Sequence, residues 1–361
     1  MIKKLDLYII RKFLGTFFFI ILLFIAIVIV FDYTEKIDNF TEYNAPMDKV
    51  WLIYYLNLVP YFVSMFIPMF IFIAVIYFTS RLAYRSEIIA ILSSGISFNR
   101  LLRPYFMVAL FLALLSFLLQ AYVIPPATKK RIEFETQYVS RKKYRLANRE
   151  HIHRQISSDT FIYLRYYYSK NKYGRVFFLE NYKNNKLIKQ IRASKITWLS
   201  ETKQWKLTNC KIRIIDENKE TLLVIPRLDT TLNLVPGELA EKKDEMQTMN
   251  LTALNKYIKD QTKKGNSSIT AYRLEKYSRL FNPFSAFILT LIGASLASRK
   301  IRGGIGLHLG LGLLISFSYI LFLKLSGIFA ISGNISTILS VVTPSILFGT
   351  IAFILYRFSP K

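Results

Sequence analysis

The chain has 361 residues, of which 52% are hydrophobic, and its formal net charge at pH 7 is +26. Long apolar runs between polar segments, with a mean hydropathy of +0.29, indicate a membrane protein that carries a sizeable soluble part. The single cysteine, Cys210, excludes an intramolecular disulfide and any metal cluster built on cysteines.

The first apolar run, Phe13–Phe31, has 19 residues without a charge, which is long enough to cross a bilayer as a helix. Basic residues precede it and no small-residue cleavage site follows it, so we expect a membrane helix and not a removed signal peptide. The Pro125-Pro126 pair predicts the end of the third membrane helix. Five more runs predict membrane helices, namely Ile53–Thr79, Tyr105–Val123, Phe281–Ala297, Ile305–Ala330 and Ile335–Tyr356.

The loop between the second and third runs, Arg81–Pro104, carries four arginines and a single acid, Glu87. Its middle, SEIIAILSSGIS, has the spacing of a short amphipathic helix with Ile88, Ile91 and Leu92 on one face. An acid in the first turn suits the positive end of the helix dipole, and Gly95 predicts the stop. Two interpretations follow from these residues: a surface helix exposed for a soluble partner, or a basic loop that only sets topology.

The charges of the short segments predict the orientation in the membrane. With a cytoplasmic N-terminus, the cytoplasmic segments are all basic, and they include Arg81–Arg103 and Arg299–Arg302. The outside segment Asp32–Lys49 has five acids and two lysines. We therefore expect cytoplasmic termini and an outside location for the large polar middle of the chain.

The polar middle of the chain, about residues 138–245, predicts an antiparallel sandwich or jelly roll. Residues 124–280 hold 33 Lys and Arg against 16 Asp and Glu, which suggests an anionic partner such as nucleic acid, a phospholipid headgroup or a phosphorylated glycolipid. The predicted parts are membrane helices 1–123, a β domain 124–250, a helical connector 251–280 and membrane helices 281–361. The predicted strands are Thr160–Tyr168, Arg175–Tyr182, Leu187–Leu199, Gln204–Ile215 and Thr221–Leu234, with a helix over Leu251–Gly265.

Motifs for catalysis or metal binding are missing from the sequence. It contains no GxxxxGK[ST], no HExxH and no paired CxxC, and His151 and His153 have no acids or cysteines to complete a metal site. No Asp or Glu lies inside the six apolar runs, which argues against ion-coupled transport. His308 is expected to be structural. Lys324 is expected to reach the membrane surface or to contact an anionic headgroup.

The layout of three membrane helices, an outside β domain and three more helices resembles the LptF/LptG (YjgP/YjgQ) permeases of lipopolysaccharide export. The sharpest local marks are YRSEIIAILSSGIS, the FNPF entry to the fourth run and the RKIRGG loop. The resemblance implies an inner-membrane permease without an ATPase site or cofactor of its own. Its implied partners are an LptB-like cytoplasmic ATPase dimer, a second LptF/LptG-type subunit, an LptC/LptA-like periplasmic bridge protein of similar β fold and lipopolysaccharide, but no nucleic acid.

The resemblance also implies roles for individual residues. A helix over residues 84–95 would dock in a groove on the ATPase, with Glu87 at the acidic coupling position. Its candidate residues are Tyr84, Arg85, Ser86, Glu87, Ile88, Ile91, Leu92 and Gly95. Candidates for contact with lipid phosphate are Lys36, Lys129, Lys130 and Arg131, although ordinary interfacial anchoring explains them equally well. Lys324 is a further candidate because of its own position near the outer end of the fifth run, where anchoring at the membrane surface is the preferred explanation. Candidates for an acyl-chain groove inside the β domain are Phe161, Phe177 and Trp205.

Three other functions stay open at this point. A lipoprotein-release or FtsX-like permease is disfavoured, because its large domain follows the first membrane helix. A non-transporting anchor whose β domain binds an anionic envelope polymer would not need a docking helix. An envelope enzyme would need an active site, and the sequence shows none. The F and G types are not separated by these residues.

Overall fold

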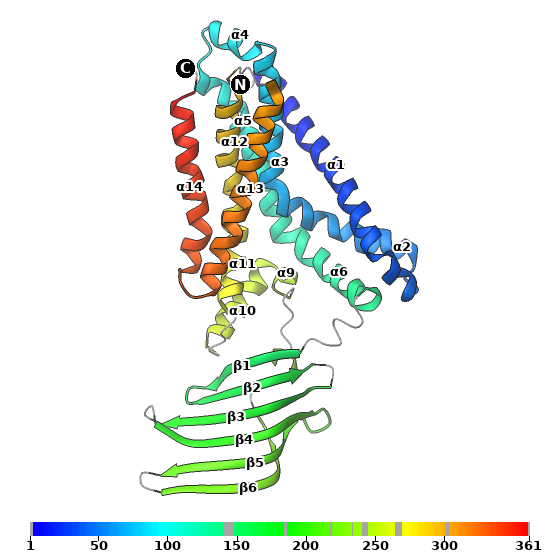
Figure 1. Ribbon diagram of the computed structural model, residues 1–361, viewed down its shortest axis with the longest axis vertical. Helices are drawn as coiled ribbons and strands as arrows, with labels where there is room; N and C mark the ends of the chain where they lie inside the picture. The colour runs from blue at the N-terminus through cyan, green and yellow to red at the C-terminus, as the bar shows by residue number, and fades with distance from the viewer. Residues whose placement is uncertain are drawn as a thin grey trace. The chain divides into compact units, whose positions relative to one another are not determined.

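The computed structural model describes residues 3–139, 148–169, 171–183, 186–216, 219–232, 234–239, 245–263, 269–299 and 304–359. The chain divides into two compact units, one holding the apolar helices and the other the strands (Figure 1). The first unit comprises Met1–Phe134, Gln247–Leu251 and Arg273–Lys361, and the second comprises Glu135–Met246 and Thr252–Tyr272.

The first unit contains six helical stretches, within the described residues, that are long and apolar enough to cross a membrane. They coincide with the six predicted apolar runs, so this part of the predicted fold class is confirmed. The short helix α4 (Glu87–Ser93) lies between the second and third stretches. The stretches are α1 (Lys4–Glu42); α2 (Met47–Lys49), η1 (Val50–Tyr55) and α3 (Leu56–Tyr84); α5 (Phe98–Leu118), η2 (Leu119–Val123) and α6 (Ile124–Tyr138); α11 (Ile269–Phe281), η3 (Asn282–Phe284) and α12 (Ser285–Ala297); α13 (Gly304–Ile331); and α14 (Thr337–Arg357).

Helix α3 is the central helix of this unit and packs against α1, α12 and α13. Phe78 of α3 stacks on Phe13 of α1, with 5.3 Å between the ring centroids, and on Tyr105 of α5 at 5.1 Å. At Gly293 of α12 the helices approach so closely that an added Cβ atom would lie 2.9 Å from Cγ1 of Val75. Aromatic packing and one small residue therefore fix α3 among its neighbours.

The third membrane stretch is longer than predicted, because the Pro125-Pro126 pair does not end it. The helix passes through η2, one turn of π-helix, into α6 and ends at Tyr138. A proline ring donates no hydrogen bond and clashes with the carbonyl four residues earlier. The two carbonyls concerned, of Ala121 and Tyr122, lie in the wider π turn, which accommodates both effects. Residues 124–138 are therefore helical and are not strands of the β domain.

The second unit contains a six-stranded antiparallel sheet in the order β1-β2-β3-β4-β5-β6, drawn in green in Figure 1. Each strand pairs with its neighbour in the chain, so the order is that of a meander. The strands β2 to β6 begin and end within four residues of the predicted bounds, which confirms the inserted β domain. The sequence pattern did not indicate β1. The elements are β1 (Asn148–Ser157), β2 (Thr160–Tyr168), β3 (Tyr173–Lys183), β4 (Lys186–Leu199), β5 (Gln204–Asp216), β6 (Lys219–Thr230), α8 (Pro236–Leu239), α9 (Glu245–Thr248) and α10 (Leu251–Lys263).

Two residues that predict turns lie inside strands. Pro226 lies in β6, which pairs only with β5 among the described strands, and a residue without an N–H group is tolerated on such an edge. Gly174 lies in β3, where an added Cβ atom would be 2.6 Å from Leu164 Cδ1 and 2.9 Å from the carbonyl oxygen of Tyr166. This glycine therefore permits close packing within the sheet.

One face of the sheet is a closed apolar core. Strand register places Leu164, Phe177, Ala193 and Cys210 in one row across four strands, and all four are buried. The segment 234–239, which follows β6 and includes α8, buries its leucines in the same core. We call residues 234–239 the covering segment.

Candidate functional site

Helix α4 occupies the position of the predicted docking helix, but it is shorter than residues 84–95 and runs from Glu87 to Ser93. Ser86, directly before it, has a left-handed backbone with φ of 62°, and Gly95, after it, has φ of 82°. The chain therefore turns sharply at both ends, and Gly95 follows the last helical residues as the sequence predicts. Glu87 stands in the first turn.

The apolar face predicted for α4 is turned toward the helix bundle. Ile88 is only 1% exposed, and Ile91 and Leu92 pack partly against the same core. These three residues therefore hold α4 in place and do not form its free surface. The exposed apolar side chains are instead Ile89, at 51%, and Tyr84, at 63%. Ile89 was missed by the sequence analysis, although its position beside the face formed by Ile88, Ile91 and Leu92 was the available signal.

Glu87 is held by the first membrane helix. Its Oε2 accepts a hydrogen bond from the Tyr8 hydroxyl at 3.0 Å. Both side chains line a pocket of about 330 Å³ between α1, α3 and α4. The cations that line the same pocket are Arg11, Lys12, Arg81 and Arg85. The carboxylate is therefore surrounded by positive charge, and a neutral hydroxyl fixes its position.

A bidentate ion pair joins α1 to α5 near α4. Arg100 donates from both terminal nitrogens to the two carboxylate oxygens of Asp6, and each distance is 2.7 Å. Asp6 is buried, and it also accepts a bond from the backbone N–H of Lys3 at 2.9 Å. The fork geometry of this pair fixes the first turn of α1 against the first turn of α5. Arg100 is therefore a structural residue and not only a topology signal.

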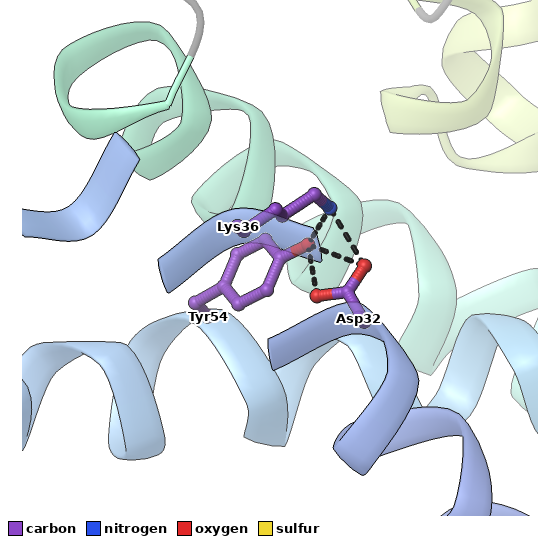
Figure 2. Close-up of polar contacts among 3 residues, drawn as sticks. All are labelled: Asp32, Lys36 and Tyr54. Carbon is purple, nitrogen blue, oxygen red and sulfur yellow. Dashed lines mark hydrogen bonds and ion pairs between the residues drawn. The ribbon is translucent and has the colours of Figure 1, made fainter. Parts of the chain in front are cut away.

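A polar cluster lies toward the other end of α1, where Asp32 and Lys36 are one helical turn apart (Figure 2). The Lys36 ammonium lies 2.7 Å from Asp32 Oδ1 and also donates to the hydroxyl of Tyr54. That hydroxyl donates to Asp32 at 2.9 Å from Oδ2, and the ammonium lies 4.8 Å from the Tyr54 ring centroid. Tyr54 comes from the π turn η1 and is buried. Lys36, a predicted phosphate contact, is thus already bound to two side chains.

The predicted cations of α6 lie on a helix that packs beside this cluster. Phe134 of α6 contacts Tyr54, with 5.7 Å between centroids, and Phe40 of α1, at 6.3 Å. Lys129 and Lys130 are exposed on the same helix, whereas the Arg131 guanidinium lies 5.1 Å from the ring centroid of Tyr61. The structure therefore brings Lys36 and the cations of α6 to one region of the unit. The pairing of Lys36 with Asp32 has a sequence signal, the i, i+4 spacing, which our sequence analysis did not use.

Lys324 is exposed on α13, and no contact among the described residues joins it to the Lys36 cluster. His308 of α13 is buried, and its Nδ1 lies 2.9 Å from the Ser80 hydroxyl of α3, as expected of a structural histidine. His151 and His153 both lie against Tyr163, and no group of three His, Cys, Asp or Glu in the described part of the chain is placed to hold a metal ion.

The three groove candidates of the β domain do not share one face. Phe177 and Trp205 are 0% exposed and belong to the core of the sheet. Phe161 is 39% exposed, and its register partner is Glu180, on the opposite face. The prediction that Phe161 points inward is wrong. Over the first half of β2 the burial alternates, and Ile162 and Leu164 are the inward residues, whereas the buried face shifts to Tyr167 further along the strand. The phase of the alternation at Phe161 therefore decides which face that residue occupies.

The covering segment is bonded to the inner face of the sheet. Trp205 donates from its indole nitrogen to the carbonyl oxygen of Leu234 at 2.8 Å. The Tyr167 hydroxyl donates to the carbonyl oxygen of Pro236 at 3.3 Å. Two aromatic residues of the core therefore hold the backbone of this segment over the apolar face. The sequence analysis did not anticipate the covering segment.

A family model described as "Lipopolysaccharide export system permease LptF/LptG" matches residues 7–357 of the chain. The match includes α1, the α4 loop, the entire sheet and the last three membrane stretches. No curated protein matches the chain.

Proposed function

Because this chain belongs to the LptF/LptG family of lipopolysaccharide export system permeases, we propose that it is one permease subunit of an ATP-driven exporter. A second subunit of the same family and two copies of an LptB-like cytoplasmic ATPase would complete the transporter. The chain would take lipopolysaccharide from the outer leaflet of the inner membrane. Its sheet would pass the lipid to a periplasmic bridge protein of the LptC/LptA kind.

The proposed topology has α4 and both termini in the cytoplasm and the sheet in the periplasm. It is supported by the basic character of the loop around α4, and by the acidic character of Asp32–Lys49 at the other end of α1. This topology would bring α4 to the ATPase. It would also bring the Asp32–Lys36–Tyr54 cluster to the membrane surface from which lipopolysaccharide is extracted.

The exposed side of α4 is the observation that carries the partnership with an ATPase. Tyr84, the last residue of α3, and Ile89 of α4 present apolar surface to solvent, and exposed polar residues such as Arg85 and Ser94 accompany them. Exposed apolar side chains rimmed by polar residues are typical of protein interaction sites. Helix-in-groove recognition uses apolar anchors of this kind. The anchors of the docking surface are therefore Tyr84 and Ile89, with Glu87 at its edge.

The need for an ATPase follows from the energy of lipid extraction. Each CH₂ group buried in the bilayer contributes about 0.8 kcal/mol, so an acyl chain of ordinary length contributes about ten. A lipid with several chains is held by tens of kcal/mol, and spontaneous extraction is negligibly slow. An apolar sheet face lowers this cost, because the chains leave the membrane for a second apolar surface. The row that contains Phe177 and Cys210 would be such a surface once the covering segment, which buries it in this structure, moves off the sheet.

The Asp32–Lys36–Tyr54 cluster supports recognition of the phosphates of the lipid. An ammonium group has three donors, and Asp32 and Tyr54 accept two of them. The third donor of Lys36 remains for a phosphate oxygen. The two partners also restrict the side chain, so that less conformational entropy is lost when the phosphate binds.

The experiment that tests this function is site-specific photocrosslinking in cells with an active or an inactive ATPase. Crosslinkers at Phe177 and Trp205 probe the inner face of the sheet, and a crosslinker at Phe161 probes the outer face of the same sheet. We expect ATPase-dependent crosslinks to lipopolysaccharide at the two inner positions and none at Phe161.

Other crosslinking results would point to other functions. Capture of a lipoprotein at the inner positions would favour the lipoprotein-release function. Absence of lipid crosslinks in both ATPase states would favour a non-transporting anchor. Equal crosslinking at Phe161 and Phe177 would contradict passage along the inner face.

A further inference from the structure

An apolar groove of about 740 Å³ lies on the first unit between α5, α12 and α14. Its walls are formed by large apolar side chains, several of them exposed. They include Phe106, Met107 and Leu110 of α5, Phe287 and Leu291 of α12, and Phe353 of α14. In a membrane helix bundle, this groove is open to the bilayer, so lipid chains are the solvent that reaches it.

The polar side chains of the groove gather at one end. Arg103 and Asn99 stand in the first two turns of α5, and Tyr356 stands in the last turn of α14. The Tyr356 hydroxyl donates to Asn99 Oδ1, which ties the two helices together at this end. Arg103 is exposed, and its guanidinium has no hydrogen bond or ion pair among the described residues. Arg100, three residues earlier, is by contrast fully engaged by Asp6.

The length of the groove fits one leaflet of a bilayer. Asn99 and Leu110 are eleven residues apart on α5, which corresponds to about 16 Å along the helix. Half of the hydrocarbon core of a bilayer is about 15 Å thick. The groove, measured from its polar end at Asn99 to Leu110, therefore covers about the depth of one leaflet.

We propose that this groove binds a glycerophospholipid of the leaflet on the α4 side of the membrane, which is the cytoplasmic leaflet in the proposed topology. One acyl chain lies along Phe106, Leu110 and Phe287, and the phosphate accepts hydrogen bonds from Arg103. The fork of an arginine matches two phosphate oxygens, which a lysine does not. This assignment rests on the topology of the proposed function but concerns a different lipid and a different face of the protein.

The lining of the groove favours a lipid over a helix of another protein. Membrane helices pack closely through Gly, Ala, Ser and Thr, and none of these residue types occurs among the described residues that line the groove. Its walls are Phe, Leu and Met side chains, which adapt to a flexible hydrocarbon chain. Among the described residues that line the groove, Arg103 is the one cation, and it complements one anionic headgroup.

The test uses the full-length chain in nanodiscs of phosphatidylethanolamine and phosphatidylglycerol, without ATPase or lipopolysaccharide. The probe is a phosphatidylglycerol with a photoreactive diazirine in the middle of one acyl chain. Crosslinked peptides are identified by mass spectrometry. We expect them to concentrate in residues 102–110 and 287–291, and to be several-fold weaker on the exposed face of α13.

Two variants separate chain binding from headgroup binding. Leu110→Trp fills the groove and should lower crosslinking several-fold, whereas Leu118→Trp, at an exposed position two turns further along α5, should not. Arg103→Gln should lower crosslinking of the phosphatidylglycerol probe about fivefold, the effect expected of one charge contact. It should leave a diacylglycerol probe with the same diazirine unchanged. Lys4→Gln removes a charge elsewhere on the same membrane face and is the matched control.

Equal labelling of the groove and of the exposed face of α13 would overturn the proposal, because contact with the lipid probe would then not be specific to the groove. The proposal would also be overturned if a crosslinker at Met107 captured another subunit in the assembled transporter. The assay contains no lipopolysaccharide, so its outcome does not depend on the export function. If the groove is labelled but the sheet gives no crosslinks to lipopolysaccharide, the lipid site in the groove stands and the export function is rejected. If the sheet crosslinks to lipopolysaccharide but the groove is not labelled, the export function stands and the lipid site is rejected.

Discussion

Tyr8 of α1 donates a hydrogen bond to Glu87 of α4, 79 residues later in the chain. Lys36, the candidate phosphate contact, lies on the same uninterrupted helix as Tyr8. Tyr8 and Lys36 are 28 positions apart, which corresponds to about 42 Å of helix. One continuous helix therefore contacts the candidate docking acid and carries the candidate lipid contact. In the proposed transporter, a movement of α4 would be transmitted along α1.

The first prediction concerns this contact. Tyr8→Phe removes the hydrogen bond to Glu87 but leaves the ring in place. We expect the variant to bind the ATPase and to lose a few-fold in the stimulation of ATP hydrolysis by lipopolysaccharide, since an exposed hydrogen bond to a charged group contributes about 1 kcal/mol. The measurement is ATPase activity of the reconstituted complex with and without lipopolysaccharide. Tyr77→Phe, which lines the same pocket without a bond to Glu87, is the control. Unchanged stimulation in Tyr8→Phe would show that this bond carries no coupling.

The second prediction concerns the Asp6–Arg100 pair. Asp6→Asn or Arg100→Gln leaves a buried or half-buried charge without its partner. We expect each single change to lower the thermal stability, by less than the loss of a partner in a fully buried pair because Arg100 is partly exposed. The measurement is the thermal stability of the purified chain in detergent. The double variant should recover part of the loss, because no unpaired charge remains. Additive losses in the double variant would mean that the two residues do not interact.

The third prediction concerns Lys36 and its partners. Lys36→Gln should lower crosslinking of lipopolysaccharide near α1 several-fold, because the contact with phosphate is lost. Tyr54→Phe should have a smaller effect in the same direction, because it frees the ammonium without removing it. Lys49→Gln, an exposed lysine outside the cluster, is the control. The Lys36 effect should shrink as salt is raised, as charge contacts are screened. An equal loss in Lys49→Gln would reject a specific role for the cluster.

The main elements of the fold were predictable from the sequence because their patterns are long. The six apolar runs follow from the apolar medium that surrounds a membrane helix. The segments that form β2 to β6 are rich in β-branched and aromatic residues and are separated by turn residues. The end of the third helix was not predictable, because Pro125 and Pro126 are accommodated by a π turn that no local pattern reveals. β1 was missed because its residues, NREHIHRQIS, are mostly polar or charged.

The candidate site was predictable in position but not in orientation. Ile88, Ile91 and Leu92 were rightly placed on one face of a helix, but periodicity does not say whether such a face meets a partner or the protein itself. The phase of β2 had the same ambiguity for Phe161. The pairing of Asp6 with Arg100 joins residues 94 positions apart, and only the packing of α1 on α5 brings them together.

The fourth prediction uses the single cysteine. Cys210 of β5 is buried in the sheet core, and burial raises the pKa of its thiol. Thiol reagents attack the thiolate, so both the low access and the raised pKa slow the reaction in the folded protein. We expect almost no labelling by a water-soluble disulfide reagent at pH 8 and complete labelling in denaturant. The rate in the native protein then reports opening of the sheet. Fast native labelling would contradict the closed core.

The fifth prediction is that Gly174→Ala loosens the sheet. The added methyl group would lie 2.6 Å from Leu164 Cδ1 and 2.9 Å from a backbone oxygen, and the oxygen cannot move without disturbing the pairing of β2 with β3. Overpacking of this kind costs about 1–3 kcal/mol. The labelling rate of Cys210 should therefore rise roughly five- to 150-fold.

Gly306→Ala is a control for this substitution, because an added Cβ atom there meets nothing within 4 Å and the site lies in α13. It should leave the labelling rate of Cys210 unchanged. If the rate in Gly174→Ala also stays at the wild-type value, Leu164 yields without cost, and the close approach at Gly174 does not stabilise the sheet. A raised rate in Gly174→Ala alone would show that the packing of β2 on β3 limits access to the apolar face along which lipid chains would pass.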